Sequence, residues 1–180
     1  MINSLYFDTD CLSAFLWVKK ENILSSLFSG KIIVPQEVYN ELSYSKIDHL
    51  KKRLDVLLNS GDAIVRQIMI GTAEYNSYLK MTTNPDKGYN IIGKGEAAVI
   101  ALASVSGGIV ASNNLKDVAA YVADLGLRHI KTGDILVEAF RRSLITEADG
   151  NRIWTDMQAK KRRLGPAASF SGYLHANNLP

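Results

Sequence analysis

The sequence is poor in the residues that build disulfides and zinc sites. Cys11 is the only cysteine, so an internal disulfide and a thiolate metal cluster are both excluded. The histidines, His49, His129 and His175, are scattered along the chain and give little support to a zinc site. A metal site in this chain would therefore have to be built mainly from oxygen ligands.

Long apolar runs are also missing. The longest uninterrupted run, Ala97 to Ala103, is far too short to span a bilayer, and the first residues lack the basic segment and apolar run of a secretory signal. We therefore expect a cytoplasmic protein. The charge excess is small, because 21 Lys and Arg against 18 Asp and Glu give a net charge of +3. Such a charge permits an anionic partner without requiring one.

What the sequence does contain is typical of a globular protein. Hydrophobic residues make up 47% and charged residues 22% of the 180 residues, a length that suits one domain or one domain with a small appendage. Apolar segments without alternation, Leu5–Phe7, Ile32–Val34 and Ile109–Ala111, predict strands covered on both faces, as in a parallel sheet. His129–Lys131 predicts a fourth strand, and Ala63–Ile70 is strand-like but ambiguous.

Helical patterns alternate with these strands. They cover residues 10–20, 22–28, 35–42, 46–59, 72–81, 96–105, 114–124, 133–142 and 147–163. Asp10 or Thr9 can cap the first of them, and for Asp10 a capping role is at least as well supported as a role as a ligand. Residues 83–89 read as a loop, and the tail at 165–180 is loop-like with a short packing segment at 170–174. Strands alternating with helices predict an α/β fold with a central parallel sheet.

Several polar side chains lie near the ends of strands or the starts of helices. They are Asp8, Glu41, Glu96, Asn113, Asn114 and Asp117. Asp8 directly follows the first strand, at the edge where open α/β sheets carry their functional crevice. Carboxylates brought together from separate elements repel one another unless a cation lies between them, and oxygen-rich sites select Mg²⁺ or Mn²⁺. Two such metals about 3.5–4 Å apart are a standard arrangement for phosphodiester hydrolysis.

Four segments in order resemble the signature blocks of PIN-domain ribonucleases. They are Tyr6–Asp10, Val34–Leu42, Gly93–Ala97 and Val110–Asn114, and Thr132–Leu136 resembles that family's next block. The resemblance implies a small three-layer α/β/α sandwich and Mg²⁺- or Mn²⁺-dependent cleavage of RNA. By position, Asp8, Glu41 and Glu96 take the metal-binding carboxylate roles, with Asn114 as a further ligand.

The resemblance also implies partners and a domain organisation. Many bacterial members are VapC-like toxins that pair with a small antitoxin and form homodimers. The resemblance therefore implies a toxin role with RNA as the substrate. No membrane partner is expected. The PIN-like nuclease domain is expected over residues 1–145. A C-terminal helix and tail, residues 146–180, are expected to pack on the same domain.

The sequence departs from the family pattern at the fourth block. Where the family usually has an aspartate, this chain has Asn113 and Asn114, with Asp117 one helical turn later. An amide is a neutral oxygen ligand and holds a second metal less tightly. Either Asp117 reaches the site, or the site works with one firmly bound ion, or the chain keeps the fold as an inactive RNA- or protein-binding module.

Other interpretations of these residues stay open. Asp8 and Asp10 also fit the start of the Asp-x-Asp-x-Thr pattern of haloacid-dehalogenase-like phosphatases, but Leu12 occupies the position of the Thr. Glu96 also suits the start of a helix, because its negative charge interacts favourably with the positive end of the helix dipole. The basic run Lys160–Arg163 is either a solvated helix end or a contact for phosphate groups.

Overall fold

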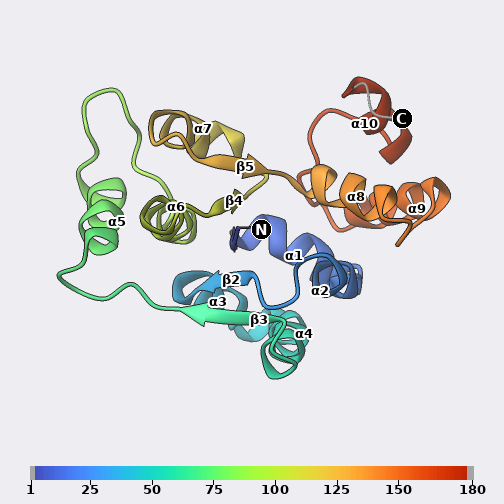
Figure 1. The fold of residues 1–180 in the computed structure, drawn as a ribbon, viewed down its shortest axis with the longest axis horizontal. Helices are drawn as coiled ribbons and strands as arrows, with labels where there is room; N and C mark the ends of the chain where they lie inside the picture. The colour runs from blue at the N-terminus through green and yellow to red at the C-terminus, as the bar shows by residue number, and fades with distance from the viewer. Residues whose placement is uncertain (1–2, 178–180) are drawn as a thin grey trace.

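A parallel sheet organises the protein, for which a computed structural model describes residues 3–177, without the side chains of Ser45, Leu115 and Asp117. Within these residues the sheet has the strand order β3-β2-β1-β4-β5, and every neighbouring pair is parallel (Figure 1). The strands are β1 (Leu5–Phe7), β2 (Ile32–Pro35), β3 (Ala63–Arg66), β4 (Ile109–Ala111) and β5 (Arg128–Ile130).

Helices cover both faces of the sheet. One face carries α1 (Thr9–Trp17), α2 (Glu21–Phe28), α4 (Asp48–Asn59) and α8 (Thr132–Arg141). The opposite face carries α6 (Lys94–Ser106) and α7 (Leu115–Asp124), with α5 (Ala73–Thr83) packed on α6 (Figure 1). The α/β/α sandwich predicted from the sequence is therefore confirmed.

The remaining helices lie at the margins of these layers. Helix α3 (Gln36–Leu42) follows β2 and contacts both α1 and α6, so it bridges the two helical layers beyond the end of the sheet. A short 3₁₀ turn, η1 (Ser45–Ile47), joins it to α4. Helix α9 (Glu147–Ala159) contacts α1 and α8, and α10 (Phe170–Ala176) packs on α8 and α9.

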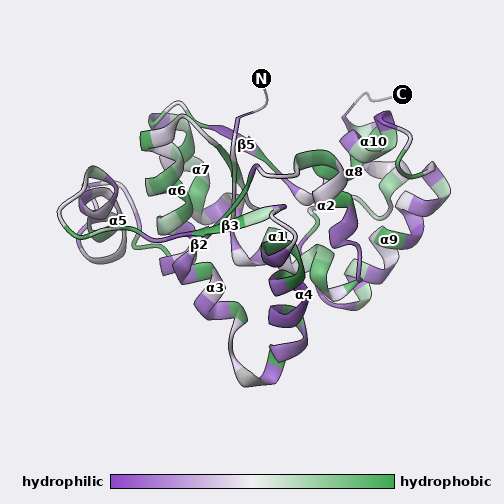
Figure 2. Ribbon diagram, turned by 60° about the horizontal axis from the view of Figure 1, so that its bottom comes forward, coloured by the Kyte–Doolittle hydropathy of each residue, from purple (hydrophilic) through white to green (hydrophobic). Residues whose placement is uncertain are grey.

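Helix α6 packs against the central strands of the sheet. It contacts β1, β2 and β4, and its residues from Ala97 to Ala103 are all buried. Small alanine side chains let the helix approach the sheet closely, and each fully buried Val, Ile or Leu contributes about 1.5–3 kcal/mol. Figure 2 shows α6 mostly green and white, whereas green and purple alternate along the amphipathic α4. Gly107, in the left-handed conformation (φ 68°), ends α6 before β4.

The strand order places a topological switch point at β1. From β1 the chain first builds outward through β2 to β3 and then crosses to β4 on the other side of β1. In open α/β sheets the crevice outside the carboxyl ends of the strands at such a point is the usual ligand site. The first residues beyond these ends are Asp8 after β1 and Ser112 after β4.

Some predicted boundaries were wrong. The segment Ala63–Ile70 is a strand only as far as Arg66, and the helix predicted over residues 147–163 ends at Ala159. Lys161 has a left-handed backbone (φ 56°) and its amide donates to the Gln158 carbonyl, so the chain turns out of the helix before the basic run is complete. The packing segment in the tail is the helix α10. No helix in the described part of the chain is both long and apolar enough to cross a membrane.

Candidate active site

The two carboxylate oxygens of Asp8 lie in different environments. Its backbone is extended (φ −79°, ψ 167°), and its Oδ1 accepts a hydrogen bond from the Cys11 amide at 2.6 Å. Asp8 is therefore the N-cap of α1, and the prediction of Thr9 or Asp10 as the cap was wrong, because α1 begins immediately after the strand. The other oxygen, Oδ2, is buried and has no hydrogen-bond partner among the described residues.

Four carboxylates from three helices and the end of β1 line one pocket. The pocket has a volume of about 160 Å³. Its lining residues are Asp8, Thr9, Asp10, Ser13, Glu41, Gly95, Glu96 and Arg162. The structure thus brings the three predicted carboxylates, Asp8, Glu41 and Glu96, to one place, although they are far apart in the sequence.

Glu41 reaches the pocket because Gly95 leaves room for it. A Cβ atom at Gly95 would lie 2.9 Å from Glu41 Oε1 and 3.3 Å from Oε2, so the Glu41 carboxylate would have to shift. The Thr9 hydroxyl donates a hydrogen bond to Glu41 Oε2. Helix α3 therefore contributes its carboxylate across the space between α1 and α6, where Thr9 orients it.

Glu96 is positioned in a similar way from the first turn of α6. The Asn114 amide, Nδ2, donates to Glu96 Oε1 at 2.8 Å, and a Cβ atom at Gly93 would overlap the other oxygen. The two glycines of the Gly-Lys-Gly-Glu segment thus have separate functions: Gly95 admits Glu41, and Gly93 admits Glu96. The N-terminal end of α6, where Glu96 lies, is also the end of a helix that attracts negative charge.

Burial dominates the electrostatics of the two aspartates. Desolvation raises the pKa of Asp8 to about 7, against the lowering effects of the Ser112 hydroxyl and the Cys11 amide, while the charges of Asp10 and Glu96 raise it further. Burial also raises the pKa of Asp10, although Arg162 and Arg163 oppose the shift with their positive charges. The pocket therefore concentrates negative charge where water solvates it poorly.

The fourth-block residues lie in different places. Asn114 is buried and contacts Glu96, so it adjoins the carboxylates. Asn113 turns toward the start of α8 instead: its Nδ2 donates to the Thr132 hydroxyl at 2.8 Å, and its Oδ1 accepts from the Thr132 amide at 2.9 Å. The structure does not bring Asn113 to the pocket. Asp117 belongs to α7, but its side chain lies outside the described part of the structure.

The donor set fits a hard divalent cation. Asp8 Oδ2 and Asp10 Oδ2 are buried carboxylate oxygens that lack a hydrogen-bond partner among the described residues, and Glu41 and Glu96 line the same pocket. All four carboxylates offer oxygen, the donor atom that Mg²⁺ and Mn²⁺ prefer. The carboxylates surround the pocket rather than meeting at one point: the described side chains include no group of three or more His, Cys, Asp or Glu already gathered as tightly as metal ligands.

Two charged members of the pocket, Asp10 and Arg162, were not among the predicted site residues. Asp10 was read as a helix cap, yet its Oδ2 is buried in the site; its spacing from Asp8, with both residues near the start of α1, was the available signal. Arg162 comes from the basic run after α9, and its approach to α1 depends on long-range packing that no local pattern reveals. Cys11 is fully buried, and burial raises the pKa of its thiol, in agreement with a core role.

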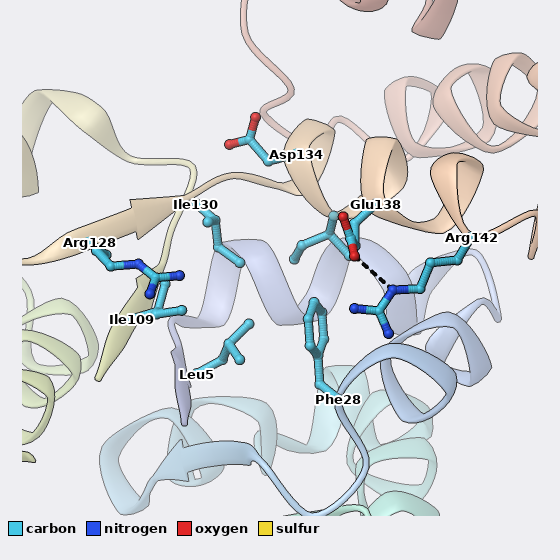
Figure 3. A pocket seen from close by; sticks show the side chains of 9 residues that line it. Leu5, Phe28, Ile109, Arg128, Ile130, Asp134, Glu138 and Arg142 are labelled. Atoms are coloured by element: carbon cyan, nitrogen blue, oxygen red, sulfur yellow. Dashed lines mark hydrogen bonds and ion pairs between the residues drawn. The ribbon is translucent and has the colours of Figure 1, made fainter. Parts of the chain in front are cut away.

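A larger pocket lies toward the amino ends of the strands, between the sheet and α8, and has a different character. Its volume is about 280 Å³, and Figure 3 shows Leu5, Phe28 and Ile130 pointing into it. Its charged residues are balanced, with two acids and two arginines, and the Arg142 Nε donates to Glu138 Oε1 at 2.7 Å. Neither an excess of charge nor an unpaired buried oxygen of a described residue marks this pocket, so we assign no chemistry to it.

A comparison with protein families decides the wider assignment. A family model described as a PIN domain, DUF3368, matches residues 5–169. The chain belongs to the PIN-domain family. A search of curated proteins found no match. PIN domains are generally nucleases that act with divalent metals, and the match spans the pocket carboxylates as well as the basic run that carries Arg162.

Proposed function

We propose that this PIN domain is a divalent-metal-dependent endoribonuclease that hydrolyses RNA phosphodiester bonds. The observation that carries the proposal is the pocket of Asp8, Asp10, Glu41 and Glu96 at the switch point of the sheet, with two buried oxygens lacking a partner in the described residues. Such a concentration of buried negative charge is costly unless a cation compensates it.

The residues of the pocket have different proposed roles. Asp8, Asp10, Glu41 and Glu96 would hold Mg²⁺ or Mn²⁺, with Thr9 orienting Glu41 and Asn114 orienting Glu96. When bound, the cation polarises the phosphoryl oxygen and makes water a better nucleophile. The carboxylates alone repel a phosphate group, so substrate binding and cation binding are coupled. Asn114 as a direct ligand stays a prediction, since the observed contact is to Glu96.

We further propose that the enzyme acts in the cytoplasm as the toxin of a toxin–antitoxin pair, with a small antitoxin as partner and a homodimer as its working form. These proposals rest on the resemblance to VapC-like members of the family. The proposed domain division, a nuclease domain at 1–145 with residues 146–180 packed on it, accords with the contacts of α9 with α1 and of α10 with α8.

A non-catalytic RNA- or protein-binding module is the second candidate. The amides at the fourth block favour it, because Asn113 and Asn114 add no negative charge to hold a second metal. The phosphatase alternative is less well supported, because it assigns no role to Glu41 and Glu96, which line the same pocket as Asp8.

The deciding experiment compares the wild type with Asp8→Asn. Asparagine is an equally good N-cap, so the variant keeps the start of α1 while losing one negative charge from the pocket. We expect Mn²⁺-dependent cleavage of RNA by the wild type and a loss on the order of 10³-fold in the variant, equivalent to about 4 kcal/mol of barrier. Bacteria that express the wild type should grow slowly and show degraded RNA, whereas bacteria that express Asp8→Asn should not. Intact RNA and equal growth in both strains would contradict the proposal, whereas binding without cleavage would favour the second candidate.

A further inference from the structure

The turn after α9 directs Arg162 toward the carboxylate pocket. Lys161 has a left-handed backbone (φ 56°), and the Arg162 amide donates to the Met157 carbonyl at 3.0 Å. Leu164 is buried just beyond, which anchors the segment on the protein. A non-glycine residue in this conformation is uncommon and is maintained by its surroundings. The turn is therefore a defined structure that delivers one side chain of the basic run to the pocket.

The Arg162 guanidinium is held at one edge. Its Nε donates to the Lys160 carbonyl at 2.8 Å, and its Cζ lies 5.8 Å from the centroid of the Trp17 ring. Lys160 Nζ lies at the same distance from that ring. An arginine whose guanidinium already lies over an aromatic ring loses less freedom when it binds an anion. The Lys160 carbonyl and the Trp17 ring thus hold the guanidinium beside the pocket.

The opposite edge of the guanidinium makes only loose contacts. Nη1 lies 3.9 Å from Asp10 Oδ1 and 3.4 Å from the Ser13 hydroxyl, both near the outer limit for such interactions. By contrast, Arg142 in the other pocket closes on Glu138 at 2.7 Å. Arg162 is therefore positioned at the carboxylates without being neutralised by a tight ion pair to a described residue.

We propose that Arg162 binds a backbone phosphate of the RNA at the carboxylate pocket. This inference rests on the proposed function and names the protein group that receives the substrate's charge. The guanidinium fork matches the oxygens of a phosphate, and it borders the four carboxylates that would otherwise repel the strand. Because the contact is to the backbone, it confers affinity without sequence preference. A competing role is that of a mere counter-ion for Asp10.

The test separates binding of RNA from binding of the cation. A short fluorescein-labelled oligouridine is titrated by fluorescence anisotropy at several salt concentrations in Ca²⁺, with a gel to verify that the RNA stays intact. We expect Arg162→Gln to weaken binding about fivefold to tenfold and to reduce the slope of log affinity against log salt by about 0.7, the value for one phosphate contact on a single strand. Arg162→Lys should keep most of the slope while losing part of the affinity. Arg152→Gln, an exposed change on α9 that removes the same charge, should leave both unchanged.

Mn²⁺ binding by calorimetry is the second measurement. Removing a positive charge beside the pocket should leave Mn²⁺ affinity equal or raise it, so weaker RNA binding in Arg162→Gln cannot come from a lost cation. Equal RNA affinity and equal salt slope in the wild type and Arg162→Gln would overturn the proposal, and a change in Mn²⁺ affinity alone would assign Arg162 the counter-ion role. Thermal melting of each variant checks folding. Failure of the wild type to cleave RNA would count against the nuclease, yet the salt slope would still report on Arg162.

Discussion

The two ends of β1 carry pockets of opposite character. Leu5 begins the strand and belongs to the larger pocket beside α8, whereas Asp8 follows its end and belongs to the smaller pocket of carboxylates. In the larger pocket each acid has a partner: Glu138 pairs with Arg142, and Asp134 accepts from the Lys131 amide and the Tyr173 hydroxyl. In the smaller pocket, Asp8 and Asp10 each retain a buried oxygen without a partner among the described residues.

This difference indicates that unbalanced charge, rather than cavity size, distinguishes the candidate active site from the other pocket. The larger pocket, with an apolar floor and cancelling charges, resembles an imperfection in core packing (Figure 3). The smaller pocket gathers four carboxylates around about 160 Å³ with one arginine. Buried, uncompensated charge lowers the stability of the folded protein when no ligand is bound. Functional sites retain such charge because it favours binding of a ligand of opposite charge. Changes at the amino end should therefore alter stability, and changes at the carboxyl end should alter cation and RNA chemistry.

The largest stability effect is expected from Leu5→Ala. The Leu5 side chain is 1% exposed between β2 and β4, so its truncation should lower the free energy of unfolding by about 2–5 kcal/mol. Urea unfolding measures the loss. The stabilisation that Mn²⁺ gives should persist in this variant, provided that it stays folded. Glu138→Gln is the mild control at the same pocket, because its half-exposed ion pair contributes only about 0–1 kcal/mol. Loss of the Mn²⁺ effect in either variant would break the distinction between the two pockets.

Asp8→Asn should change how stability depends on pH. The pKa of Asp8 is about 7 in the folded protein, against 3.8 for an unperturbed aspartate as in the unfolded chain. The folded protein therefore binds this proton more tightly. In EDTA, wild-type stability should therefore fall as the pH rises from about 4 to about 7 and level off above, by an amount on the order of 4 kcal/mol. Other groups titrate in both proteins, so the difference between the two curves isolates Asp8. Parallel curves across this window would mean that burial does not disfavour the Asp8 charge.

Gly95→Ala should impair the site while preserving the fold. The added methyl group would displace the Glu41 carboxylate, because its carbon would lie only 2.9 Å from Glu41 Oε1. We expect cleavage to fall by about 10- to 100-fold, the usual cost of disturbing the support of a metal ligand. In a Glu41→Ala background the same change should cost nothing further, as a double-mutant cycle with initial cleavage rates would reveal. An equal cost in both backgrounds would indicate that Gly95 acts through α6 rather than through Glu41.

Local patterns predicted the fold and the carboxylates, but not how the site is completed. Unbroken apolar runs identified β1 and β4, and the rule that sites follow strand ends led to Asp8. Asp10 was left out of the predicted site because a carboxylate in a first helical turn is usually explained by capping and dipole effects. The position of Arg162 could not be predicted from local patterns, because it depends on the turn at Lys161. Asn113 and Asn114 look equivalent in sequence, yet their side chains face α8 and Glu96 respectively.

The central claim is that the carboxylate pocket binds a divalent cation, and direct titration of Mn²⁺ tests it without any substrate. Calorimetry at about pH 7.5, above the pKa of Asp8, would compare the wild type, Asp8→Asn and Glu138→Gln. We predict saturable Mn²⁺ binding by the wild type and by Glu138→Gln, and at least tenfold weaker binding by Asp8→Asn, which corresponds to about 1.4 kcal/mol. Identical isotherms for the wild type and Asp8→Asn would contradict the account.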